Sequence, residues 1–121
     1  MQKSNNFIIY NLVLNYEKYI RKYVLNKIPN NHRDLRIHLM DENYNLVKYL
    51  YYAIYNKGNI RTKYITDLLI SLSLLDYILS LIMTVTPENK KYIITSLEYL
   101  ANIKNMVFTW KKRLDEESKS K

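Results

Sequence analysis

Basic side chains are the most numerous groups in this 121-residue sequence that could bind a partner by charge. Nineteen lysines and arginines outnumber eleven aspartates and glutamates, which gives a formal net charge of +8 at pH 7. An excess of this size favours a polyanionic partner, such as nucleic acid or an anionic surface. The excess is uneven, because residues 1–36 carry seven basic and two acidic side chains, while residues 65–89 carry three acidic and no basic ones.

Ten of these residues occur in short clusters and are the candidate nucleic-acid contacts: Lys27, Arg33, Arg36, Arg61, Lys63, Lys90, Lys91, Lys111, Lys112 and Arg113. Phosphate contacts give affinity and salt dependence but do not read sequence. A solvated helix surface is the alternative for any one cluster. The clusters show no aromatic ladder spaced for stacking, and an AT-rich coding sequence explains most of the thirteen tyrosines. We therefore expect binding to be directed mainly at phosphates.

The sequence contains no zinc motif, no glycine-rich phosphate loop and no Ser-His-Asp or carboxylate-pair pattern with a catalytic spacing. His32 and His38 are the only histidines, there is no cysteine, and their spacing does not form a zinc motif. The single glycine, Gly58, cannot build a glycine-rich phosphate loop. We predict no catalytic residue, no metal and no cofactor. The lack of cysteine fits a reducing compartment, and the first residues do not form a signal peptide, so we expect a cytoplasmic location.

One short segment offers an enzymatic alternative. Residues 33–38, RDLRIH, resemble the motif of the four-helix HEPN ribonucleases, in which Arg and His converge on the scissile phosphate. That resemblance would give His38 the proton transfer and Arg33 the stabilisation of charge. The family carries the motif late in its domain, whereas here it opens the second predicted helix. A basic surface patch is the preferred interpretation.

Four helical segments must position these side chains. Apolar residues recur every three or four positions over residues 5–27, 31–56, 60–84 and 87–115, and the charged tail 116–121 is expected to fray. One glycine and two prolines leave little turn chemistry for β-hairpins. Short connections favour antiparallel neighbours, so we predict a single all-α domain, an up-down-up-down four-helix bundle.

This topology makes three local predictions. The second helix should face inward with a seam at three- and four-residue steps, formed by Ile37, Met40, Tyr44, Val47, Tyr51 and Ile54, and flanked by Leu39, Leu46, Leu50 and Ala53. Thr86 should cap the N-terminus of the fourth helix, with Pro87 at its first position. One end of the bundle should carry a basic rim, which we define as Lys27, Arg33, Arg36, Lys90 and Lys91.

The third helix is apolar on two faces. Its central stretch, residues 65–83, is rich in Leu and Ile, with Thr and Ser confined to narrow strips. A helix of this kind is normally buried on most sides, so we predict that one face packs on the bundle and another on a neighbouring subunit. A membrane span is the alternative, but Asp67 and Asp76 make insertion costly, and no membrane association is expected.

Features spread along the chain resemble a known family. Ile28-Pro29, His32 and Arg36, the segments 57–59 and 64–67, Thr86-Pro87 and Trp110 recur in the order found in the accessory variability determinant proteins of diversity-generating retroelements. Close relatives of that family are encoded in ribosomal-RNA intervening sequences. The resemblance covers residues 16–114. The glycines and arginine that members carry before the tryptophan are missing from residues 104–110, and so are two arginines of their third helix.

The resemblance implies an antiparallel bundle that assembles into a pentameric ring. It also implies a basic surface that binds nucleic acid and a reverse transcriptase, without catalytic activity. The sequence therefore predicts a non-enzymatic accessory protein that holds RNA or an RNA/DNA hybrid near a reverse transcriptase. The alternatives are the ribonuclease described above and an assembly module with no nucleic-acid role.

Overall fold

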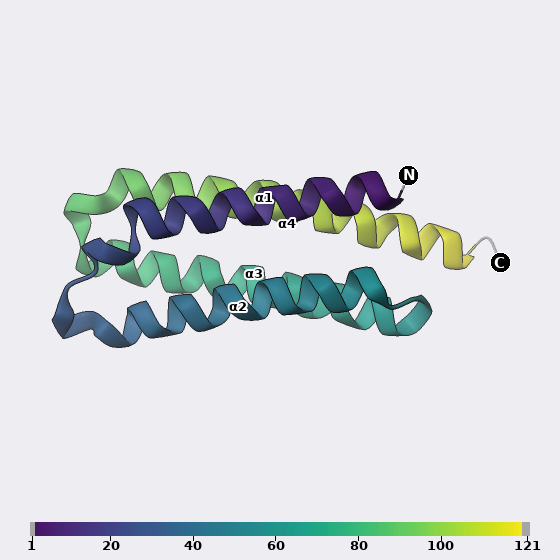
Figure 1. The fold of residues 1–121 in the computed structure, drawn as a ribbon, viewed down its shortest axis with the longest axis horizontal. Helices are drawn as coiled ribbons and strands as arrows, with labels where there is room; N and C mark the ends of the chain where they lie inside the picture. Colours follow the sequence, from purple (N-terminus) through teal and green to yellow (C-terminus); the bar gives the residue numbers. More distant parts are fainter. Residues whose placement is uncertain (1, 120–121) are drawn as a thin grey trace.

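A computed structural model describes the backbone of residues 2–119 and the side chains of residues 8–117 and 119. Figure 1 shows four long helices: α1 (Gln2–Tyr23), α2 (Arg33–Tyr55), α3 (Gly58–Val85) and α4 (Lys90–Lys119). Short 3-10 turns lie in the connections, namely η1 (Leu25–Lys27), η2 (Asn30–His32) and η3 (Pro87–Asn89). Residues 2–119 contain no strand, so the predicted all-α four-helix bundle is confirmed.

The helix ends differ most from the predicted ones at the C-termini of α1 and α4. α1 ends at Tyr23, and the last residues assigned to it form the turn η1. α4 continues to Lys119, so residues 116–119 are helical, contrary to the expectation of a frayed tail. Residues 120–121 of that tail lie outside the described part of the chain.

The four helices lie along one long axis. Figure 1 shows both termini at one end, together with the α2–α3 connection, and the α1–α2 and α3–α4 connections at the other end. The closest neighbours are α2 and α3, followed by α3 and α4, and then α1 and α4. Among the helices that pack side by side, α1 and α2 make the least contact.

The core lies between the four helices, and α2 presents a different face to it from the one predicted. Leu39, Leu46, Leu50 and Ala53 are fully buried. The predicted seam is wrong at four positions, which are exposed: Ile37, Met40, Tyr44 and Tyr51. The physical reason is that α2 packs mainly on α3 and hardly on α1. The residues that were predicted to flank the seam therefore form the buried face of α2.

The α3–α4 connection corrects a second prediction. The hydroxyl of Thr86 donates a hydrogen bond of 2.7 Å to the carbonyl of Ile82 in the last turn of α3, and it makes no N-terminal cap bond. Thr86 is fully buried, and its backbone N–H also donates to the Ile82 carbonyl, at 2.9 Å, so this carbonyl satisfies the buried hydroxyl within α3. Pro87 occupies the first position of the 3-10 turn η3, whereas the prediction placed it at the first position of the fourth helix, which begins at Lys90.

α3 presents two apolar faces. One face is buried against the other helices through residues such as Leu68, Leu72 and Leu79. The opposite face carries Ile70, Leu74 and Tyr77, which are 61%, 42% and 60% exposed. Among the described residues, α3 is the one helix long and apolar enough to cross a membrane, a property that buried core helices share.

Candidate nucleic-acid interface

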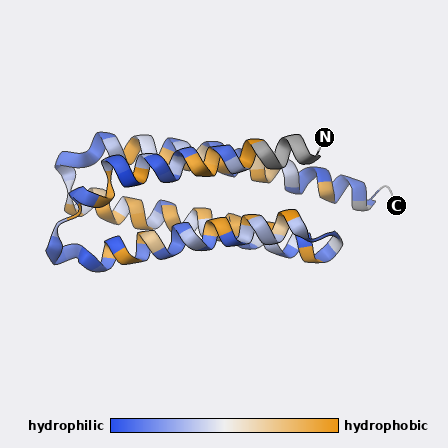
Figure 2. Ribbon diagram, viewed as in Figure 1, coloured by the Kyte–Doolittle hydropathy of each residue, from blue (hydrophilic) through white to orange (hydrophobic). Residues whose placement is uncertain are grey.

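The basic rim lies at the end of the molecule that holds the α1–α2 and α3–α4 connections, where hydrophilic residues gather (Figure 2). Lys27, Arg33, Lys90 and Lys91 are all exposed there. Ion pairs among the described residues include Glu17–Arg21, Asp76–Lys104 and Asp115–Lys111, and none of these three uses a residue of the rim. Cations without carboxylate partners leave their charge available to a polyanion.

Arg36 is the exception in the rim, because it is half-buried. Its guanidinium donates a hydrogen bond to the carbonyl of Ile28, which fastens α2 to the connection after α1. Its Nε is buried without a partner among the described residues. A guanidinium held in this way is less free to meet a phosphate than the side chain of Arg33.

Arg61 is buried, at 8% exposure, so the prediction that it is a surface contact is wrong. Its Nε donates to the carbonyl of Ala53 at 2.8 Å, and a terminal nitrogen donates to Ile54 at 2.9 Å. These carbonyls belong to the last turn of α2, where a cation suits the negative end of the helix. The guanidinium carbon also lies 5.6 Å from the centre of the Trp110 ring.

The remaining candidates lie at the opposite end from the rim, with the start of α3 and the later part of α4 (Figure 1). Lys63 and Lys112 are exposed, and Arg113 is half-buried. Lys111 pairs with Asp115 at 3.2 Å. The ten predicted contacts therefore fall into two groups at opposite ends of the bundle and do not form one continuous surface.

An aromatic and basic surface that the sequence analysis missed runs along the seam of α1 and α4. We call it the tyrosine strip: Tyr99, Tyr19, Tyr23 and Tyr92, with Lys18, Lys22, Lys27 and Lys91. Consecutive rings in that order have centroids 5.4, 4.7 and 5.4 Å apart. All four rings are half-buried. We expected no aromatic ladder spaced for stacking beside the basic clusters, and these rings pack on one another in the seam while four lysines lie beside them.

Lysines lie against the rings of the strip. The Nζ of Lys27 is 3.7 Å from the centroid of the Tyr92 ring, and that of Lys91 is 5.0 Å from it. Lys27 lowers the pKa of Tyr92 from its ordinary value, through hydrogen bonding and charge, and Lys91 adds to the effect. The Nζ of Lys22 lies 5.2 Å from the Tyr23 ring. Two residues of the rim, Lys27 and Lys91, thus also belong to the strip.

The strip contains an open hollow of about 240 Å³. Its lining residues carry two positive charges and no carboxylate: Asn15, Lys18, Tyr19, Lys22, Tyr23 and Tyr99. The sequence signal for this surface was present in two short spacings. Tyr19 and Tyr23 are four residues apart, and so are Lys18 and Lys22. Residues four apart share a helix face, so each pair lies together on α1.

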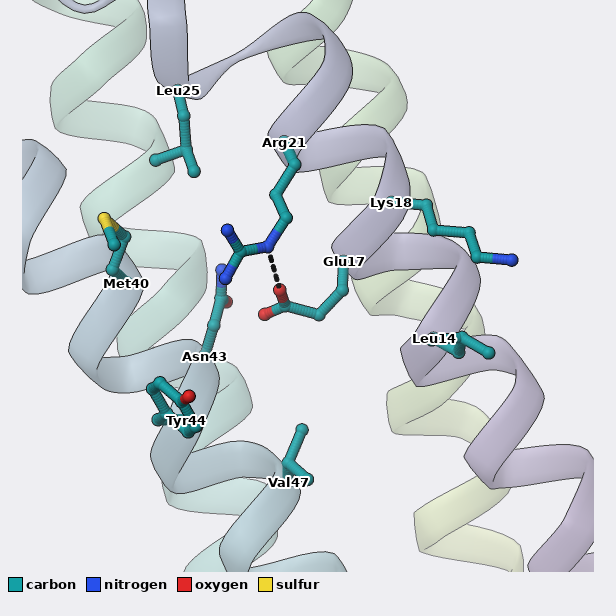
Figure 3. Close-up of a pocket in the computed structure, with 9 residues that line it drawn as sticks. All are labelled: Leu14, Glu17, Lys18, Arg21, Leu25, Met40, Asn43, Tyr44 and Val47. Carbon is teal, nitrogen blue, oxygen red and sulfur yellow. Dashed lines mark ion pairs between the residues drawn. The ribbon is translucent and has the colours of Figure 1, made fainter.

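A second hollow, of about 270 Å³, opens between α1 and α2, where the two helices touch least. Figure 3 shows apolar side chains from both helices around it, with the ion pair of Glu17 and Arg21, 3.5 Å long, near its middle. Burial raises the pKa of Glu17 above its usual range, and Arg21 offsets part of this rise. Beside the hollow, Tyr16 donates a buried hydrogen bond of 2.7 Å to Asn43.

The geometry of Arg33 and His38 bears on the ribonuclease alternative. Both side chains are exposed on α2, and residues five apart on a helix point about 140° apart. The two side chains of one chain therefore point to different sides of α2. The described residues contain no group of three or more His, Cys, Asp or Glu side chains that could hold a metal ion.

Comparisons of the chain with protein-family models, with curated proteins and with solved structures find no match.

Proposed function

We propose that this chain is a non-catalytic nucleic-acid-binding protein that contacts phosphates through the basic rim. The observation that carries the proposal is the group of exposed cations at one end of the bundle, none of them ion-paired among the described residues. Such a surface binds a polyanion by releasing counterions, and its affinity falls steeply with salt. The net charge of +8 acts in the same direction.

A salt titration tests the rim. Each phosphate contact on duplex DNA contributes about 0.9 to the slope of log affinity against log salt. Replacing Arg33 and Lys90 together by alanine should therefore flatten the slope by about two units if both touch phosphate. The matched control is the double replacement of Lys63 and Lys112, which are exposed at the other end. An unchanged slope in the rim variant, or an equal loss in the control, contradicts the proposal.

The resemblance to retroelement accessory proteins supports a more specific role, in which the bound nucleic acid is RNA or an RNA/DNA hybrid and the protein partner is a reverse transcriptase. In that role the chain works in the cytoplasm, without a cofactor or a membrane. A reverse transcriptase and a template repeat encoded beside this chain would support the role. If that enzyme and this chain form no complex at any salt concentration, the result would count against this role.

We also propose that the helices form an up-down-up-down antiparallel bundle that assembles into a pentameric ring. Two unfilled apolar surfaces support assembly: the outward face of α3 and the groove between α1 and α2. Different surfaces that meet between copies make a head-to-tail contact, which closes into a ring when the rotation allows. The acidic segment 65–89 and the basic segment 1–36 suit such a contact.

Light scattering at micromolar concentration should give about five times the chain mass of 14.7 kDa. Leu74→Glu places a charge on the exposed apolar face of α3 and should release monomers. Ser73→Glu is the control, because Ser73 is exposed on the polar strip of the same helix. A stable wild-type monomer at that concentration, or equal dissociation in both variants, rules out assembly through this face.

A further inference from the structure

We infer that the tyrosine strip is a binding track for single-stranded nucleic acid, in which bases lie against the tyrosine rings and the lysines take the phosphates. This inference rests on the proposed nucleic-acid binding and names the strand type and the surface. The rim alone offers point charges, which bind the phosphates of either form and distinguish single strands from duplexes only through charge density. The strip adds rings, and only an unpaired strand can bring base faces to them.

The arrangement of the rings carries the first step. Four tyrosines from two helices follow one another at centroid distances between 4.7 and 5.4 Å, and each is half-buried. The rings pack on one another in the seam, with Tyr23 and Tyr92 stacked at an interplanar angle of 6°, and each ring keeps part of its surface exposed. A fixed ring loses little conformational freedom when a base stacks against it, and stacking tolerates any base because every base has a π face.

The charges around the rings carry the second step. Lys18 and Lys22 line the hollow beside Tyr19, and Lys27 and Lys91 lie over Tyr92 at the other end of the ladder. No carboxylate lines the hollow. Basic side chains along an aromatic row form the combination that tracks a single strand, with the cations on the backbone and the rings on the bases.

The shape of the strip carries the third step. Its hollow is open and shallow, lined from two helices, and the ladder continues past it to Tyr92. An enclosed pocket would suit a small ligand, whereas an open row suits a polymer. An acidic protein segment would also meet the lysines, but its flat side chains occur only at some positions, whereas every nucleotide of a strand carries a base.

The test compares a single strand with a duplex of equal length at fixed salt, using fluorescence anisotropy with a labelled polythymidine strand and a labelled duplex. Replacing Tyr19 and Tyr99 together by leucine removes two rings of the hollow but keeps apolar volume. Each stacked base contributes a factor of about five or more to affinity. We expect single-strand affinity to fall about thirtyfold and duplex affinity to change less than twofold.

Two matched variants act as controls. The double replacement by phenylalanine keeps both rings and should leave single-strand binding unchanged. Tyr52 and Tyr64 form another ring pair, 4.9 Å apart, between α2 and α3, and their double replacement by leucine should also leave it unchanged. The inference is overturned if the Tyr19 and Tyr99 variant loses as much affinity for the duplex as for the single strand, or loses none. It is also overturned if the Tyr52 and Tyr64 variant loses as much single-strand affinity. These outcomes include the case in which the strip binds an acidic protein.

A second measurement covers the case in which the leucine variant does not fold. Ultraviolet cross-linking of the wild type to a strand that carries 5-iodouracil should place the cross-links on Tyr19, Tyr23, Tyr92 or Tyr99. Cross-links found only elsewhere overturn the inference. A wild type that binds neither strand nor duplex overturns the proposed function itself, whereas duplex binding with an inert strip overturns this inference alone.

Discussion

Replacement of Arg61 should destabilise the protein without changing how it binds nucleic acid. The guanidinium donates to two carbonyls in the last turn of α2, those of Ala53 and Ile54, and lies over the ring of Trp110. Through these contacts Arg61 of α3 caps the C-terminal end of α2 and contacts α4. Arg61→Met keeps an apolar stem of similar length and removes both hydrogen bonds together with the charge over the Trp110 ring, so it measures their combined contribution.

The expected loss follows from the number and kind of these bonds. A hydrogen bond from a charged donor contributes about 1.5–3 kcal/mol, but water can reach part of a helix end and satisfy a released carbonyl. We therefore expect Arg61→Met to lower the free energy of unfolding by about 2–4 kcal/mol. Urea unfolding slopes for small proteins are about 1–3 kcal/mol per molar, which places the shift of the midpoint near 1–2 M.

Urea unfolding followed by circular dichroism, at one fixed protein concentration, measures this shift. Lys63→Met is the control, because Lys63 is exposed two residues away and an exposed substitution changes stability by about 0.5 kcal/mol or less. Arg61→Lys should fall between wild type and Arg61→Met, since an ammonium keeps the charge but lacks the fork that reaches two carbonyls. A midpoint for Arg61→Met within error of the wild type would refute the structural role.

Three further predictions concern α1 and α2. Asn43→Ala leaves the buried hydroxyl of Tyr16 without its acceptor and should cost about 1–3 kcal/mol in urea unfolding; stability equal to the wild type would contradict this. Burial raises the pKa of Glu17 above 4.5, so its contribution to stability is present below that pH and is lost as pH rises through the raised pKa. Glu17→Gln should therefore flatten the decline in urea midpoint as pH rises from 4.5, and parallel profiles would count against it. The wild type should not cleave RNA without metal; cleavage that disappears in His38→Ala would establish the ribonuclease alternative.

Helix content could be predicted from the sequence, whereas the inward face of α2 could not. Two sets of residues on α2 have the same three- and four-residue steps, one through Met40 and Tyr44 and one through Leu39 and Leu46. The buried set also includes Asn43, a polar residue whose amide is satisfied by Tyr16 of α1. Because that partner lies 27 residues away, spacing within α2 gave no reason to place Asn43 in the core.

The candidate contacts show the same limit. Charge and clustering identified Lys27, Arg33, Lys90 and Lys91, which are exposed. The same criteria selected Arg61, because charge and clustering do not show whether an arginine near the start of a helix faces water or the end of the preceding helix. Gly58, with φ of 62°, lets the chain turn back directly after α2, and this turn brings Arg61 to the carbonyls of α2. Because the connection is short, Arg61 lies buried against the end of α2 and does not face solvent.

The rim and the strip share Lys27 and Lys91, and this overlap gives the two proposals different signatures. A strand that lies along the tyrosine strip would place its phosphates near Lys27 and continue toward the rim at the same end of the bundle. Loss of Arg33 and Lys90 should then weaken single strands and duplexes together, whereas loss of tyrosine rings should weaken single strands alone. Charge on this surface would set how strongly nucleic acid is held, and the rings would set which form of it is held.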